Sequence, residues 1–176
     1  MHMISIDMAG DLEKKLAEGM RPMDQGDFKK AYSSFKKLAA EFPESAEVWF
    51  YKAETGNYAA GMAGAKISDD EVAEAYKKAI ELDPGNSEYF ASYGAFCISV
   101  GRFEEAEKAY SEAAEMDESN ASRFYSEFAA DYYNAVLARF GEIMDDPKAR
   151  APYAKKAIVY MLKALEISPE EAKTLL

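Results

Sequence analysis

The 34 residues from Ser87 to Asn120, SEYFASYGAFCISVGRFEEAEKAYSEAAEMDESN, contain the pattern on which the rest of the chain is built. Apolar and small residues recur every three or four positions on both sides of Gly101, which is typical of two amphipathic helices. Glycine between two such runs favours a tight turn, so the stretch predicts a helical hairpin. The residues that mark the hairpin are Gly94, Gly101, Phe103, Ala106, Tyr110 and Ala113.

The same pattern recurs at three other places in the chain. The second helix returns 34 positions earlier, the turn returns 75 positions earlier, and the last helix returns 51 positions later. A period near 34 residues, with small and aromatic residues at fixed offsets, indicates stacked helical hairpins. The recurring residues are Val72, Tyr76, Ala79, Leu82 and Asp83, then Gly19 and 26–31, and finally Ala157, Met161, Ala164 and Ile167.

On these residues the chain resembles the tetratricopeptide repeat family over about residues 11–169. The resemblance implies an all-α fold, an α-solenoid of stacked antiparallel helical hairpins. It predicts about four repeats, of which the second and fourth are enlarged, and a short C-terminal helix. Residues 1–10 lack the period and are expected to form a disordered tail before a domain over residues 11–176.

Two regions depart from the regular repeat. Extra residues between Ala53 and Val72 favour a longer first helix with an enlarged turn, because the flanks on both sides stay in register. A phosphate-binding loop is excluded there, since the segment lacks a Gly-Lys-Ser/Thr ending. Pro22 removes a backbone donor, so the first helix, from Asp11, is expected to kink or to end near Met20.

Helix starts are visible as capping residues. Ser68 with Glu71, and Ser168 with Glu171, match the capping box, in which the two side chains satisfy each other's backbone N–H. The pair 146–147, an aspartate followed by proline, predicts the start of a final long helix.

Composition limits the classes of partner. The chain has 176 residues, is 49% hydrophobic and 30% charged, and has a formal net charge of −11. An acidic surface repels phosphate backbones, which disfavours nucleic acid and anionic membranes and favours a basic protein or peptide. The alternative interpretation is that the acids only keep a helical protein soluble.

Few side chains are suited to catalysis or to holding a metal. Cys97 is the single cysteine and His2 the single histidine, so the sequence predicts no disulfide, no metal site and no cofactor. The Met-His-Met start also fits a cloning remnant. With no signal peptide or membrane-spanning run in the sequence, a cytoplasmic location is expected.

No catalytic set of residues is visible, so a non-enzymatic role is predicted. The acids at 69–71 and 145–146 precede expected helices, where negative charge favours the helix dipole. Chemistry that uses only carboxylates stays open, because pairs formed in space are invisible in the sequence.

The resemblance implies a concave surface lined by the first helix of each hairpin, where a protein partner binds. Lys and Arg are scarce at these positions, so the clamp that binds a C-terminal carboxylate in the chaperone-binding branch of the family is expected to be absent. A basic, amphipathic segment fits better. The predicted peptide-binding residues are Glu13, Leu16, Met20, Glu47, Phe50, Tyr51, Glu54, Tyr58, Glu88, Ser92, Tyr125 and Tyr133.

These observations predict a scaffold or adaptor that binds a segment of another protein. One alternative is self-assembly, in which Leu175 and Leu176 dock into a neighbour's groove. Another is an accessory or chaperone subunit of a larger complex. A further possibility is that some of the listed aromatic residues pack against the long last hairpin instead of a partner.

Overall fold

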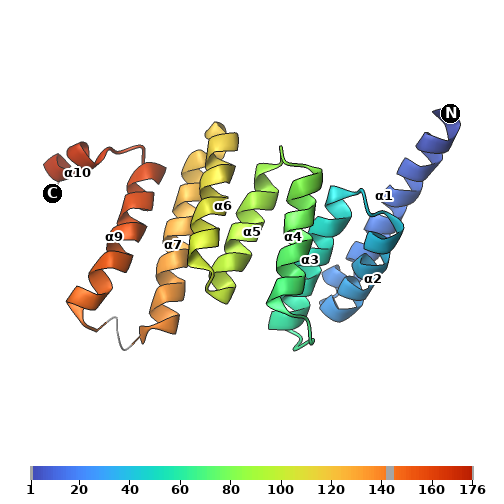
Figure 1. Cartoon of the computed structure of the whole chain (residues 1–176), viewed down its shortest axis with the longest axis horizontal. Helices are drawn as coiled ribbons and strands as arrows, with labels where there is room; N and C mark the ends of the chain where they lie inside the picture. The colour runs from blue at the N-terminus through green and yellow to red at the C-terminus, as the bar shows by residue number, and fades with distance from the viewer. Residues whose placement is uncertain (1, 142–144, 176) are drawn as a thin grey trace. The chain divides into compact units, whose positions relative to one another are not determined.

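In a computed structural model of the chain, the backbone is described for residues 2–141 and 145–175, and side chains for residues 10–141 and 145–174 (Figure 1). The chain divides into two compact units, Met1–Pro84 and Gly85–Leu176. The described residues form helices and no strand, so the predicted all-α fold of stacked hairpins is confirmed within each unit.

The first unit contains α1 (His2–Asp24), α2 (Phe28–Glu41), α3 (Ala46–Gly61) and α4 (Asp69–Leu82). The second contains α5 (Ser87–Val100), α6 (Phe103–Met116), the 3-10 turn η1 (Glu118–Asn120), α7 (Ala121–Arg139), α9 (Pro147–Ala164) and α10 (Pro169–Leu175).

In the first unit, α2 packs between α1 and α3, and α4 packs on α3. Phe35 of α2 is completely buried at the centre of a core that includes Leu16, Leu38 and Val48. Gly19 of α1 lets the two helices approach, because a Cβ atom there would lie 3.1 Å from the Phe35 ring. Small residues at the predicted positions therefore set the spacing of the helices.

In the second unit, a glycine likewise lets α5 and α6 pack closely. A Cβ atom on Gly94 would lie 2.6 Å from Cδ2 of Tyr110, closer than a methyl group can approach. Helix α7 then packs on both α5 and α6, and α9 packs on α7. The buried rings of Phe124 and Phe128 fill the space around α7.

Capping residues begin most of the helices where the sequence predicts. The side chains of Asp27, Ser45 and Ser68 accept hydrogen bonds from backbone N–H groups at 3.1–3.3 Å, and Asp146 accepts one at 2.9 Å. The capping box of Ser168 and Glu171 is complete: Glu171 N–H donates to the serine hydroxyl, and Ser168 N–H donates to the glutamate.

The capping box predicted at Ser68 is half wrong. Ser68 caps α4, but the carboxylate of Glu71 does not return to it. Glu71 instead accepts a hydrogen bond of 2.5 Å from the hydroxyl of Tyr32 and forms an ion pair of 3.2 Å with Lys36, both on α2. The tertiary partners outcompete the local one because they satisfy a part-buried hydroxyl.

The first helix differs from the prediction at both ends. It begins at His2, not at Asp11, and it continues through Pro22 to Asp24. Pro22 is tolerated because it lies near the end of α1, where it removes one backbone N–H donor. The turn that follows closes the helix through a hydrogen bond from the N–H of Gly26, which has a φ of 75°. The expectation that residues 1–10 form a disordered tail in solution stays a prediction.

The enlarged second repeat takes the predicted form. Helix α3 has 16 residues, two more than the 14 of α5, and the turn that follows it contains Gly64 with a φ of 62°. Gly56 lies inside the helix and faces the ring of Tyr32, 3.1 Å from where its Cβ would be. The surplus residues thus lengthen the helix and its connection to α4.

Candidate functional site

A groove of about 520 Å³ lies between α1 and α3 in the first unit. Both helices are the first members of their hairpins, which is where the resemblance places partner-binding surfaces. The structure brings together five of the predicted residues here, together with Leu12 and Ala17. The residues that line this α1–α3 groove are Leu12, Glu13, Leu16, Ala17, Met20, Glu47 and Tyr51.

The floor of the α1–α3 groove is apolar and firmly held. Leu16 is buried in the core of the first unit, and Leu12, Met20 and Tyr51 pack against that core while remaining partly exposed. The ring of Tyr51 lies 5.3 Å from that of Phe35 between centroids. The α1 residues lie on one face of the helix because they are four positions apart: Leu12, Leu16 and Met20. A fixed apolar floor of this kind can bury the side chains of a partner.

Two acidic side chains line the same groove. Glu13 on α1 and Glu47 on α3 are both exposed to solvent. Burial raises the pKa of the Tyr51 hydroxyl, and the charges of Glu47 and Glu54 raise it further. None of the described residues that line the groove is Lys or Arg, so its charge is wholly negative.

The other predicted residues of the first unit do not line the groove. Glu54 is partly buried and accepts a hydrogen bond of 2.5 Å from the hydroxyl of Tyr76. Burial raises the pKa of the Glu54 carboxyl, although the bond from Tyr76 opposes the shift. Phe50 packs between rings, 5.4 Å from Tyr51 and 6.3 Å from Tyr76. Tyr58 is 38% exposed and stacks on Phe28 at 5.2 Å.

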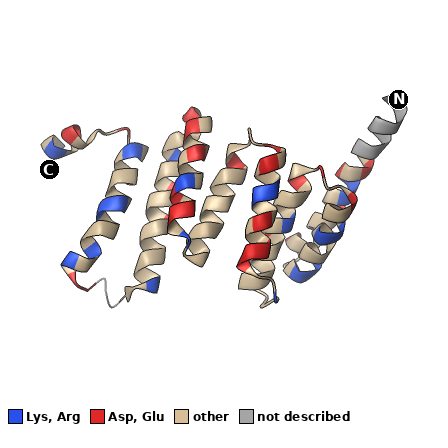
Figure 2. Cartoon of the chain, viewed as in Figure 1, with Lys and Arg blue, Asp and Glu red and all other residues tan. Residues whose placement is uncertain are grey.

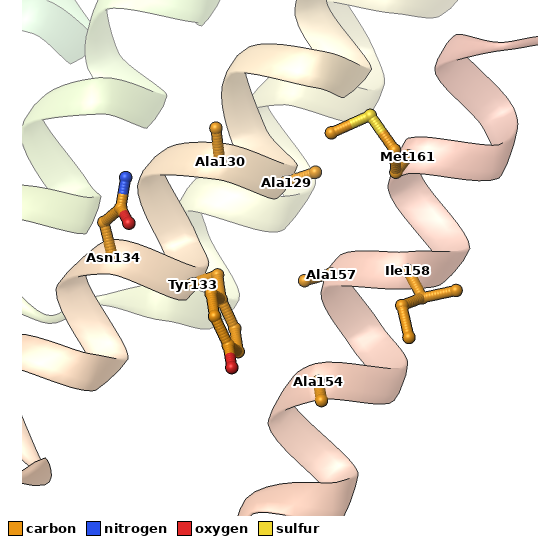
Figure 3. Close-up of a pocket in the computed structure, with 8 residues that line it drawn as sticks. All are labelled: Ala129, Ala130, Tyr133, Asn134, Ala154, Ala157, Ile158 and Met161. Carbon is orange, nitrogen blue, oxygen red and sulfur yellow. The ribbon is translucent and has the colours of Figure 1, made fainter. Parts of the chain in front are cut away.

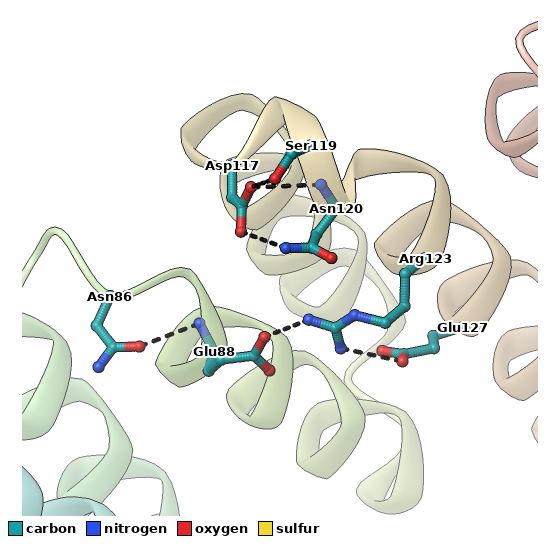
Figure 4. Close-up of polar contacts among 7 residues, drawn as sticks. All are labelled: Asn86, Glu88, Asp117, Ser119, Asn120, Arg123 and Glu127. Atoms are coloured by element: carbon teal, nitrogen blue, oxygen red, sulfur yellow. Dashed lines mark hydrogen bonds and ion pairs between the residues drawn. The ribbon is translucent and has the colours of Figure 1, made fainter.

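Glu88, the predicted groove acid of α5, takes part in a polar network of the second unit. It forms an ion pair with Arg123 of α7, which also binds Glu127 at 3.1 Å (Figure 4). Its own backbone N–H donates to Asn86 at 3.2 Å. Ser92, one turn further along α5, is half-buried. Glu88 is therefore paired within the protein, although it shares the single charge of Arg123 with Glu127.

The last two predicted residues lie on α7, near the final hairpin. Tyr125 packs on Tyr160 of α9, with ring centroids 5.8 Å apart, as the alternative interpretation of the aromatic residues expects. Tyr133 lines an apolar cleft of about 430 Å³ between α7 and α9, and its ring extends into the space between the two helices (Figure 3). The residues that line this α7–α9 cleft are Ala129, Ala130, Tyr133, Asn134, Ala154, Ala157, Ile158 and Met161.

The sequence prediction misses the exposed apolar surface of α9. Ile158 and Leu165 are 58% and 60% exposed, and Val159 and Met161 are each 39% exposed. The signal available in the sequence is the composition of the helix, PKARAPYAKKAIVYMLKA, which combines basic and apolar residues and contains no acid. The repeat pattern picks out only the residues at its fixed offsets, such as Ala157 and Ala164, and so does not point to Ile158 or Leu165.

Two further kinds of site are absent from the described part of the chain. No group of three or more His, Cys, Asp or Glu side chains is placed to hold a metal ion among those residues. No helix within them has the length and apolar character needed to cross a membrane.

Comparison with known proteins agrees with the architecture. A family model described as Tetratricopeptide repeat matches residues 75–108, from α4 into α6. The crystal structure of MamA is similar to this chain with a TM-score of 0.65 at 22% identity, covering 92% of this chain and 81% of the other. A second crystal structure of MamA protein gives a TM-score of 0.65 at 21% identity, covering 97% and 80%. No curated protein matches the chain at the level of sequence.

These comparisons confirm the resemblance to tetratricopeptide repeats and, at this level of identity, the fold alone. Repeats of this class are typical of non-enzymatic proteins that bind other proteins, because stacked hairpins present an extended surface for a partner. The chain therefore has the fold of a helical repeat protein.

Proposed function

We propose that this protein is a non-enzymatic scaffold or adaptor that binds a basic, amphipathic segment of a protein partner in the α1–α3 groove. One observation supports this most directly: the groove combines a fixed apolar floor with two exposed acids, and none of the described residues that line it is basic. A helix whose apolar face enters such a groove buries its anchors, while its lysines and arginines meet the acids at the rim.

The floor and the rim of the groove have different roles. Tyr51 is a half-buried aromatic residue supported from behind by Phe35, which is the environment in which single residues contribute most to binding. Glu13 and Glu47 are solvent-exposed, so their charges act mainly on the rate of association and are screened by salt. Micromolar affinity, about −8 kcal/mol, is typical of a site of this kind.

The binding kinetics of a synthetic helical peptide, with leucines on one face and lysines on the other, test these roles. Tyr51→Ala is expected to raise the dissociation rate, because it removes an anchor. Glu13→Gln with Glu47→Gln is expected to slow association and to flatten its dependence on salt. The matched control is Glu18→Gln with Glu44→Gln, which removes two exposed acids that do not line the groove.

Binding that is indifferent to salt and to all three substitutions in the groove would refute this site. Turnover of a substrate that a single carboxylate substitution abolishes would refute the non-enzymatic role. We place the function in the cytoplasm, since the single cysteine, Cys97, is buried and the fold does not depend on a disulfide, which suits a reducing compartment. The self-assembly expected of Leu175 and Leu176 concerns side chains outside the described residues.

A further inference from the structure

Helix α9 has a charge opposite to that of the protein as a whole. The chain has a formal net charge of −11, yet α9 contains five Lys or Arg residues and no Asp or Glu (Figure 2). Lys148 and Lys155 are exposed, whereas Lys156 pairs with Glu107 of α6 at 2.5 Å. A basic helix on an acidic protein is the natural complement of an acidic groove.

The inner face of α9 is held in place, which fixes the direction of its outer face. Tyr160 is buried, its ring lies 4.5 Å from that of Phe128, and its hydroxyl donates to Glu107 at 2.9 Å. Ser122 of α7 also donates to the carbonyl of Ala164 at the end of α9 at 2.5 Å. The residues on the opposite side are therefore presented to solvent by a rigid helix.

An apolar stripe runs from this outer face to the rim of the α7–α9 cleft, where Met161 points toward α7 (Figure 3). Ile158, Met161 and Leu165 stand at positions i, i+3 and i+7, the spacing by which a helix places three anchors in a groove. Lys155 precedes Ile158 by one turn and lies on the same side of the helix. The stripe thus has the pattern that the α1–α3 groove fits: apolar anchors beside a basic residue.

We propose that the α9 stripe of one copy of this protein docks in the α1–α3 groove of a second copy. Ile158, Met161 and Leu165 would cover the apolar floor, and Lys155 would approach Glu13 and Glu47. The inference rests on the proposed function of the groove and names its occupant as this same chain.

Charge complementarity favours this pairing over the alternatives. Contact between two α9 stripes would bring Lys148 and Lys155 of both copies together, which is repulsive. An anionic lipid surface would be repelled by the net charge of the protein. A contact between two different surfaces is heterologous, so each copy can use its groove and its α9 at once, and the copies close into a ring or extend into an open chain.

Sedimentation equilibrium over a range of concentrations, at low and at physiological salt, tests the contact. The expected result is a mass that rises with concentration and rises less at higher salt. Ile158→Glu is expected to weaken association by at least about tenfold, as loss of an interface anchor does. Met62→Glu is the matched control, because Met62 is an exposed apolar residue, 72% exposed, directly after α3 and outside the groove.

The acceptor is tested by reversing charge in the groove. Glu13→Lys with Glu47→Lys is expected to abolish growth of the assembly, whereas Glu18→Lys with Glu44→Lys, which changes net charge equally, is expected to preserve it. Circular dichroism confirms that each variant is folded.

A mixture of two defective variants gives the sharpest result. Ile158→Glu retains an intact groove, and the Glu13→Lys, Glu47→Lys variant retains an intact α9. Mixed together they are expected to form a 1:1 dimer that grows no further, since each copy has one working surface.

Three results would overturn the inference. The first is wild-type protein that stays monomeric while its groove still binds the lysine-rich peptide, which would leave the proposed function standing. The second is a mixture that remains monomeric although wild-type protein associates. The third is binding of monomeric wild-type protein to phosphatidylserine vesicles that Ile158→Glu abolishes, which would assign the stripe to lipid.

Discussion

Gly94 shows how one residue sets the distance between two helices. A Cβ atom there would lie 2.6 Å from the ring of Tyr110, which is itself buried and therefore unable to move aside. Gly94→Ala is expected to destabilise the protein by about 1–3 kcal/mol, the usual cost of overpacking a core.

Urea unfolding of Gly94→Ala beside Gly61→Ala measures this effect. Gly61 is the last residue of α3, and a methyl group added there would meet nothing within 4 Å. Gly61→Ala is expected to be neutral or to stabilise by up to about 1 kcal/mol, because alanine favours the helix. Equal effects of the two substitutions would show that the contact with Tyr110 does not limit the packing.

Glu54 makes stability depend on pH. Burial raises the pKa of its carboxyl in the folded protein above the ordinary value of 4.5. The stability that comes from protonated Glu54 is therefore fully present below the unfolded-state pKa and is lost as the pH rises through the folded-state pKa. Glu54→Gln, which keeps an acceptor for Tyr76, is expected to gain stability relative to wild type as the pH rises from about 4 to about 7.

Unfolding of both proteins across this range of pH measures the difference. Tyr76→Phe removes the hydrogen bond that holds the pKa of Glu54 down, so it is expected to move the loss of stability to higher pH. A difference in stability between wild type and Glu54→Gln that stays constant with pH would contradict the assignment.

At the scale of the helix, Pro22 leaves a weak place in α1. The helix continues through it to Asp24, but the missing N–H removes one backbone hydrogen bond. Amides in residues 20–24 are expected to exchange hydrogen faster than those in residues 94–99 of α5, which lie in a regular and mostly buried helix. Exchange measured by mass spectrometry decides this, and equal protection of the two segments would count against it.

Helices are more predictable from the sequence than the partners of individual side chains. The capping residues Ser45 and Asp146 mark helix starts because capping is a local interaction, visible within four residues. The start of α1 is not predictable in this way, because residues 2–10 lack the apolar period on which the prediction depends.

In the candidate site too, the spacing of residues along a helix is predictable from the sequence, whereas the partners of individual side chains are not. Helical spacing places Leu16 and Met20 on one face of α1, and in the structure they line the same groove as Tyr51, whose role in binding stays a prediction. Glu54 and Glu88 have partners within the protein, Tyr76 and Arg123, which lie 22 and 35 residues away in the sequence. Such partners depend on how the hairpins stack, and a single sequence does not reveal the stacking.

At the scale of the whole molecule, the distribution of charge says more about binding partners than the net charge does. The net charge of −11 indicates repulsion of nucleic acid and anionic lipid, yet α9, with five Lys or Arg residues and no acid, is strongly basic. One chain therefore contains both an acidic groove and a basic apolar stripe. The attraction between these two surfaces weakens with salt, since the Debye length falls to about 8 Å at physiological ionic strength.

Our central claim is that the α1–α3 groove binds a basic amphipathic helix. Hydrogen exchange of the protein with and without the lysine-rich helical peptide tests this claim most directly. We expect new protection in residues 12–20 and 47–51, which is lost in Tyr51→Ala. Protection confined to residues 129–161 around the α7–α9 cleft, or no protection at saturating peptide, would contradict it.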